Sequence, residues 1–219
     1  MIDFQLIINK FPLLLRGAVI TLEIAALGTF IGIIFGTLLG LGHRSKNSLI
    51  RILVTIYVTI MRGTPMLIQI FIVYYVLPQI GLGLPRFWAA ALAIGFNSAA
   101  YISQIIKAGI QSVGFGQIEA AQVMGFSKWQ ITRFIILPQA FAVVLPALGN
   151  ELITLIKDSS LASTIGVAEL TREASQISSA TYDYMSIYLA VAFIYLVMTF
   201  SLSQLVRYLE KRMTKHVTT

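Results

Sequence analysis

Two carboxylates stand seven residues apart in an apolar stretch of the chain. Glu151 and Asp158 are separated by two helical turns, and Thr154 lies between them on the same side. A third ionisable side chain, Arg62, interrupts another apolar stretch. Ionisable groups at membrane depth are costly, so each of them indicates a functional site by default. Two acids in an apolar setting persist more readily beside a cation, which favours a positively charged ligand.

A third apolar stretch adds neutral polar groups to the candidate site. Asn97, Ser98 and Tyr101 lie on nearly one face of a helix and would line a water-filled cavity with the acids. The predicted ligand-binding residues are Glu151, Asp158, Asn97, Ser98, Tyr101, Arg62 and Thr154.

The chemistry of the predicted site favours a basic amino acid as ligand. One acid would bind the α-ammonium group, and the second suits the extra positive charge of arginine, lysine or histidine. Arg62, or backbone N–H groups near Gly63 and Pro65, would meet the ligand carboxylate. The alternative is structural: Glu151 and Asp158 would form ion pairs with Arg62 or Lys157.

Composition places these residues in a membrane protein. The 219-residue chain is 57% hydrophobic and 11% charged, whereas soluble domains are about 25% charged. We therefore predict an all-α integral membrane fold of five transmembrane helices in one domain, residues 1–219. The expected spans are residues 17–42, 50–77, 87–107, 134–156 and 184–207, and residues 108–133 form a loop.

Basic residues predict the orientation of the chain. The predicted loops place ten basic residues on one side of the membrane and five on the other. The richer side holds Arg44, Lys46, Arg51, Lys107, Lys128, Arg133, Arg207, Lys211, Arg212 and Lys215. The positive-inside rule places this side in the cytoplasm, so the N-terminus is expected outside and the C-terminus inside. The net charge of +7 is thus assigned to membrane orientation and not to nucleic-acid binding.

Metal and disulfide chemistry are not expected. The chain has no cysteine, and its two histidines, His43 and His216, stand in basic flanks and not at ligand spacing. No Gly-Lys dipeptide occurs, so the phosphate-binding loop of ATPases is absent from the chain. We predict no catalytic residue, no metal site and no cofactor bound by this chain itself.

Glycine and proline indicate how the spans pack and bend. Gly28, Gly32, Gly36 and Gly40 recur every fourth residue on one face, where another helix can approach closely. This face is interpreted as generic helix packing, with a functional dimer seam as the alternative. Pro12 is expected to interrupt any helix in an interfacial segment, residues 1–16, and the run from Arg62 to Pro65 to kink the second span.

The loop at residues 108–133 carries the most specific pattern. Ile118, Ala121 and Met124 recur at helical spacing, and Gly125 is expected to end the short helix with a positive φ. Small residues allow a close approach to a partner backbone. The predicted contact residues are Glu119, Ala120, Ala121, Met124 and Gly125, with Phe126 and Trp129 as apolar anchors.

This loop resembles the coupling loop of the permease subunits of ATP-binding-cassette (ABC) importers. That loop reads Glu-Ala-Ala, three residues, Gly, then nine residues to Ile-x-Leu-Pro. Here Glu119, Ala120, Ala121, Gly125, Ile135, Leu137 and Pro138 match it. The runs Arg62–Pro65 and Lys157–Ser163 resemble the polar amino-acid branch of the family, so the likeness covers essentially the whole chain.

The resemblance implies a type I (MetI-like) permease fold, a transport role by alternating access, and no enzymatic activity in this chain. It implies a cytoplasmic ABC ATPase dimer that binds ATP and Mg²⁺, into which the loop helix inserts. The further partners implied are a second permease copy in a homodimer, an extracellular or periplasmic solute-binding protein, an amino-acid ligand and the lipid of a bacterial cytoplasmic (inner) membrane, which the chain crosses several times.

Three alternatives stay open on the sequence alone. A glutamine-type branch of the same family shares these motifs. A secondary amino-acid transporter driven by an ion gradient would also use intramembrane acids, although the inverted repeats of many such folds are not evident. A non-transporting scaffold or channel component ranks last, because intramembrane Arg62 and Glu151 are expensive for a scaffold.

Overall fold

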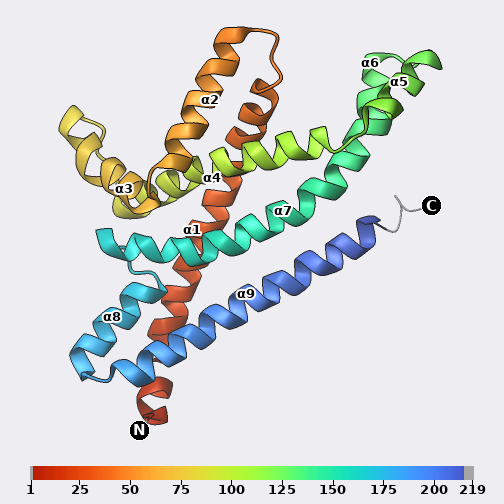
Figure 1. The fold of residues 1–219 in the computed structure, drawn as a ribbon. Coiled ribbons are helices and arrows are strands. Elements are labelled where there is room, and N and C mark those ends of the chain that lie inside the picture. Colours follow the sequence, from red (N-terminus) through yellow and green to blue (C-terminus); the bar gives the residue numbers. More distant parts are fainter. Residues whose placement is uncertain (1, 215–219) are drawn as a thin grey trace.

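The computed structural model describes residues 2–214 as helices joined by short turns, with no strand in that range (Figure 1). Lys215 and His216 lie outside the described residues. The α-helices are α1 (Phe4–Gly42), α2 (Ser48–Gly63), α3 (Met66–Phe71), α4 (Arg86–Gln111), α5 (Phe115–Val123), α6 (Lys128–Ile131), α7 (Leu137–Asp158), α8 (Leu170–Thr181) and α9 (Tyr184–Thr214). Short π or 3-10 segments are η1 (Ile72–Val76), η2 (Leu77–Ile80), η3 (Thr132–Ile136) and η4 (Ser159–Ile165).

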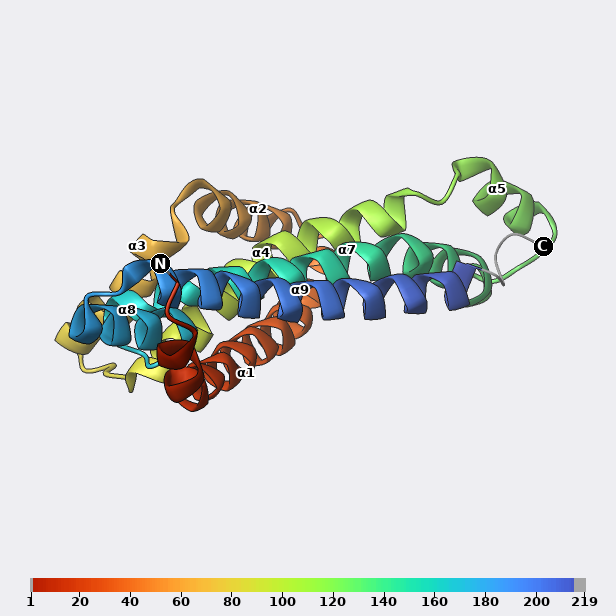
Figure 2. The ribbon, with the colours of Figure 1, turned by 90° about the horizontal axis from the view of Figure 1, so that it is seen from below.

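The all-helical prediction agrees with this architecture. Four helical stretches of the described chain are long and apolar enough to cross a membrane, namely α1, α4, the run from Lys128 to Ile165, and α9. A fifth is obtained if α2 and the helical segment Met66–Ile80 count as one broken span. Figure 2 shows an elongated arrangement, with α8 and the N-terminus toward one end and α5 at the other.

The first helix is longer than predicted. It begins at Phe4 and runs through Pro12, so the expectation that Pro12 interrupts a separate interfacial segment was wrong. The Asp3 side chain caps the helix by accepting from the Leu6 backbone N–H at 2.9 Å. A proline removes one backbone bond only, and apolar helices in membrane proteins tolerate that loss.

The glycine face of α1 packs against α4 of the same chain. Gly28, Gly32, Gly36 and Gly40 are all buried, as their spacing predicted. A Cβ atom added to Gly36 would lie 2.7 Å from the Ile102 Cβ atom and 2.9 Å from the Ala99 carbonyl oxygen. The face therefore serves helix packing within the chain, and α1 lies across α4 in Figure 1.

The second span is broken where the sequence predicted a kink. The axes of α2 and of the helical segment Met66–Ile80 differ by 105°. Thr64 and Pro65 between them have extended backbones, with ψ of 143° and 135°. Proline disfavours a helical conformation in the preceding residue, which explains why α2 ends here.

A buried acid fixes α8 to the rest of the chain. Glu169 caps α8 by accepting from the backbone N–H groups of Arg172 at 2.7 Å and Thr171 at 2.9 Å. The Tyr195 hydroxyl of α9 donates to the same carboxylate at 3.2 Å, and the Thr21 hydroxyl of α1 lies 3.5 Å from it. Burial raises the pKa of Glu169, and these hydrogen bonds offset part of that rise.

Replacing Gly36 by alanine tests the α1–α4 contact. The added methyl group has no room beside Ile102, so Gly36→Ala should destabilise the detergent-solubilised protein by about 1–3 kcal/mol. Thermal unfolding should show this as a Tm lower by about 2 °C or more. Gly116→Ala is the matched control, since nothing lies within 4 Å of an added Cβ there. An equal Tm for both variants would contradict the close approach.

Candidate functional site

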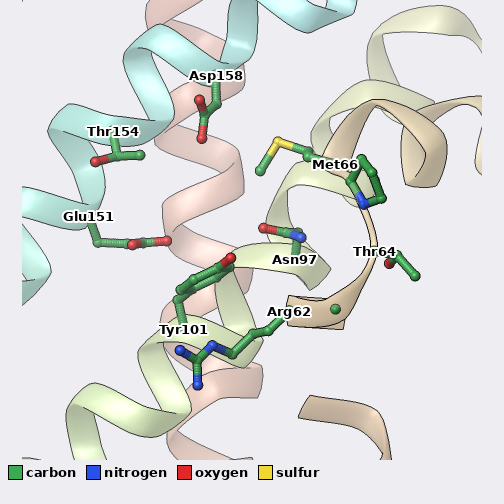
Figure 3. A pocket seen from close by; sticks show the side chains of 10 residues that line it. Arg62, Thr64, Met66, Asn97, Tyr101, Glu151, Thr154 and Asp158 are labelled. Atoms are coloured by element: carbon green, nitrogen blue, oxygen red, sulfur yellow. The ribbon is translucent and has the colours of Figure 1, made fainter. Parts of the chain in front are cut away.

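A cavity of about 460 Å³ lies where the broken span faces α4 and α7 (Figure 3). Its volume falls within the range of small-molecule sites. The lining residues are Arg62, Gly63, Thr64, Pro65, Met66, Asn97, Tyr101, Glu151, Thr154 and Asp158. All of the predicted ligand residues except Ser98 belong to this lining.

Glu151 is oriented by a neighbouring helix. The Ser98 hydroxyl of α4 donates a 2.7 Å hydrogen bond to its carboxylate. Ser98 itself is fully buried and is not part of the cavity wall. Ser98, which the sequence predicted to contact the ligand, thus orients Glu151, and Glu151 faces the cavity.

Asp158 and Thr154 complete the α7 wall of the cavity. Figure 3 shows Asp158 and Glu151 projecting from α7 toward the same space, two turns apart. The Thr154 hydroxyl donates to the Asn150 carbonyl of its own helix at 3.0 Å. Two acids on one face create a negatively charged wall that suits a cation.

Arg62 lies at the opposite wall. Its guanidinium carbon is 5.2 Å from the centre of the Tyr101 ring, a cation–π contact. In the described part of the chain, Arg62 forms this contact and no ion pair with Glu151 or Asp158. The described chain therefore shows no ion pair of these acids with Arg62, while Lys157, the other partner considered in the alternative, still interacts electrostatically with Asp158.

Asn97 lines the cavity but is also committed to the break in the second span. Its amide donates to the Met61 carbonyl at 3.1 Å and to the Gln69 side-chain oxygen at 3.0 Å. Sequence reasoning missed Thr64 and Met66 in the cavity lining and Gln69, which lies behind it and accepts from Asn97. A glutamine inside an apolar run four residues after Pro65 was the available signal for Gln69.

The loop predicted to bind a partner contains a short helix, α5. Gly125 follows it with φ of +82°. The Gly125 N–H donates to the Gln122 carbonyl and the Phe126 N–H to the Ala121 carbonyl, each at 3.0 Å. The αL residue thus closes the helix in a tight turn, as the sequence predicted.

The surface of this loop is apolar and exposed. Met124 is 74% exposed and Val123 is 89% exposed, while Glu119, Ala120 and Gly125 are also exposed. Ala121 is only 4% exposed and faces the chain itself. Sequence reasoning missed two members of this surface, Phe115 and Val123. Patches of exposed large apolar side chains are typical of sites that contact another protein or a membrane.

The chemistry available at the cavity is reversible binding. The charged and polar groups supply hydrogen bonds and charge complementarity to a small zwitterion. Within residues 2–214, no cluster of three or more His, Cys, Asp or Glu residues is arranged to hold a metal ion.

Comparison with known proteins places nearly all of the chain in one family. The family described as "Binding-protein-dependent transport system inner membrane component" matches residues 9–215. The nopaline transport system permease protein NocM of Agrobacterium fabrum is 42% identical, covering 98% of this chain and 93% of the relative. The arginine transport system permease protein ArtQ of Bacillus subtilis is 38% identical, with 97% of both chains covered. The glutamine transport system permease protein GlnP of Escherichia coli is also 38% identical, covering 96% of this chain and 97% of the relative.

Solved structures agree with this placement. A chain from a structure described as an amino acid ABC transporter with histidines is 40% identical, with a TM-score of 0.92 over 97% of this chain and 99% of that chain. A chain of the MetNI methionine ABC transporter, 24% identical, shares the fold with a TM-score of 0.75 over 96% of this chain and 99% of that chain. The chain therefore belongs to the family of binding-protein-dependent transport system inner membrane components.

Proposed function

We propose that this chain is the permease subunit of an ATP-driven importer and that its cavity binds a polar amino acid in transit. The observation that carries the proposal is the cavity itself, in which Glu151 and Asp158 face Arg62 and Tyr101 across a space of about 460 Å³. Such a site complements both ends of a zwitterion. Membership of the family and the amino-acid permeases among the relatives support the same substrate class.

The ligand that fits best is a basic amino acid. One of the two acids would bind the α-ammonium group, while the other remains for a side-chain cation. Arg62 would leave the Tyr101 ring and meet the ligand carboxylate. The relatives named for nopaline and arginine transport support this choice. Relatives named for glutamine transport support the second candidate, an uncharged polar amino acid.

The coupling partner is proposed to be a cytoplasmic ABC ATPase dimer. Met124, Gly125 and the exposed residues around them would enter a groove on that partner. ATP and Mg²⁺ would bind the ATPase, and its closure would rock the helices between inward-facing and outward-facing states. Under this proposal the N-terminus lies outside and α5 lies in the cytoplasm of a bacterial cell.

Two further partners complete the proposed importer. A second copy of the permease would form a homodimer around the translocation pathway. A solute-binding protein on the outer side would deliver the ligand to the cavity. The description of the family as binding-protein-dependent supports this last partner.

Glu151→Gln tests the ligand site. Removing the charge while keeping the shape should weaken arginine binding by about tenfold to hundredfold, because hydrogen bonds to charged groups contribute roughly 1.5–3 kcal/mol. The assembled permease–ATPase complex in nanodiscs, titrated with radiolabelled arginine, gives this Kd directly.

The matched control is Glu23→Gln, which neutralises an exposed acid of α1 outside the cavity lining. It should leave the Kd unchanged. Arginine binding that is equally tight in Glu151→Gln and wild type would refute the site. Displacement of bound arginine by excess glutamine, but not by lysine, would favour the glutamine-type candidate.

A pair of substitutions at Gly125 tests the coupling loop. Valine resists the positive φ at this position by about 1–2 kcal/mol, whereas asparagine tolerates it. In proteoliposomes, Gly125→Val should reduce ligand-stimulated ATP hydrolysis about tenfold, and Gly125→Asn should retain most of it. Equal activities of the two variants would show that the turn geometry is unimportant for coupling.

A further inference from the structure

The break in the second span creates a problem of hydrogen bonding. In an unbroken helix, the Met61 carbonyl would accept from the backbone nitrogen of residue 65, four positions later. That residue is Pro65, which has no N–H to donate. The Thr64 carbonyl also loses its helical partner, because the Ile68 N–H donates to the Pro65 carbonyl at 3.0 Å instead. A carbonyl left bare in hydrocarbon is costly, so both groups need donors from the protein.

One side chain supplies donors to both carbonyls. The Gln69 amide nitrogen lies 2.9 Å from the Met61 carbonyl oxygen and 3.2 Å from the Thr64 carbonyl oxygen. It also lies 2.7 Å from the Thr64 hydroxyl oxygen, so its two N–H groups are shared among three acceptors at the break. Gln69 is only 7% exposed. It belongs to α3, while Met61 belongs to α2, so its amide bridges the two halves of the broken span.

The bridge extends to α4. The Gln69 side-chain oxygen accepts from the Asn97 amide at 3.0 Å, and the same Asn97 amide donates to the Met61 carbonyl at 3.1 Å. A second tie lies close by, where the Tyr57 hydroxyl of α2 donates to the Phe96 carbonyl of α4 at 2.7 Å. The bend is therefore anchored to the helix that carries part of the cavity wall.

Gln69 itself is absent from the cavity lining, whereas two of its hydrogen-bond partners, Thr64 and Asn97, belong to it. The cavity wall from Arg62 to Met66 runs from the end of α2 to the start of α3, the two halves of the span that Gln69 connects. Asn97, its partner on α4, lines the same cavity. Any change in the bend moves Arg62 relative to the two acids on α7.

We infer that Gln69 is a positioning residue for the ligand site: its amide holds the 105° bend and thereby sets the distance of the Arg62 wall from Glu151 and Asp158. The inference rests on the proposed role of this cavity in ligand binding. It assigns affinity control to a residue that does not touch the ligand. Loss of the amide would allow a wider range of bend angles, because within residues 2–214 no other donor bonds to the Thr64 carbonyl.

Gln69→Met is the test, since methionine keeps the length of the side chain and offers no donor. The chain has no cysteine, so Leu53→Cys on α2 and Ile80→Cys on η2 provide unique spin-label sites on either side of the break. Both side chains are exposed. Double electron–electron resonance on nanodisc complexes with one labelled permease copy gives the distance distribution across the bend. Radiolabelled arginine binding and ligand-saturated ATP hydrolysis are measured on unlabelled complexes.

We expect Gln69→Met to broaden the distance distribution and to raise the Kd for arginine about tenfold or more. Ligand-saturated ATP hydrolysis should stay within about twofold of wild type, because the coupling loop is untouched. Gln79→Met is the matched control: this glutamine lies on η2, is exposed, and in the described part of the chain its side chain donates to the Tyr75 carbonyl alone, at 3.4 Å. It should change none of the three readouts.

Two results would overturn the inference. An unchanged distance distribution would show that Gln69 does not hold the bend. An unchanged Kd, with a lower maximal rate, would show that Gln69 serves only the stability of the fold. Gln69→Asn, whose amide is one methylene too short to reach Met61, gives the same comparison where the methionine variant assembles poorly.

The Glu151→Gln complex separates this inference from the proposed function. Normal arginine binding in Glu151→Gln, together with a raised Kd in Gln69→Met, would reject the acid site but retain the positioning role. A wild-type complex that binds no amino acid would reject the proposed function, while the distance distributions would still decide whether Gln69 holds the bend.

Discussion

Carbonyl groups inside a membrane must find their donors within the protein, and this constraint shapes the second span. A straight helix satisfies its own backbone, but the break at Thr64 and Pro65 leaves the Met61 and Thr64 carbonyls without their helical N–H donors. Gln69 and Asn97 meet that demand with side-chain amides. Half of the ten residues that line the cavity, Arg62 to Met66, stand at this break.

The close contact of α1 with α4 reaches the same cavity by another route. A Cβ atom at Gly32 would lie 2.9 Å from the Ser98 hydroxyl oxygen, so glycine leaves the room that this hydroxyl occupies. Ser98 then donates across to Glu151 of α7. Three helices thus meet at one hydroxyl group, and helix packing on one side determines the orientation of an acid on the other. Gly32, which lies outside the cavity lining, therefore contributes to the orientation of Glu151.

The sequence was informative wherever a local rule decides the structure. The recurrence of glycine at every fourth residue predicted the buried face of α1. Pro65 predicted the break in the second span, and Gly125 predicted the turn after α5. The cavity residues were found because ionisable groups are rare in apolar stretches. The prediction from Pro12 was wrong, because the effect of a proline depends on whether the surrounding helix tolerates the loss of one backbone hydrogen bond.

Roles that depend on two distant segments could not be predicted in this way. Ser98 was placed on the right helical face, but its partner lies 53 residues away in the chain. Gln69 was missed because its carbonyl acceptors become visible only when the bend is formed. Ala121 shares the helical spacing of Met124, yet one is buried and the other exposed, because neighbouring elements cover only part of α5.

The buried acid at the start of α8 bears on the order of assembly. Glu169 draws hydrogen bonds from its own helix and from Tyr195 of α9, which is synthesised later. Until α9 has entered the bilayer, the carboxylate lacks its tyrosine donor and the apolar cover that α9 provides. The complete hydrogen bonding of Glu169 at the start of α8 therefore requires α9. A chain that ends before α9 would therefore lack one of the donors that satisfy this carboxylate.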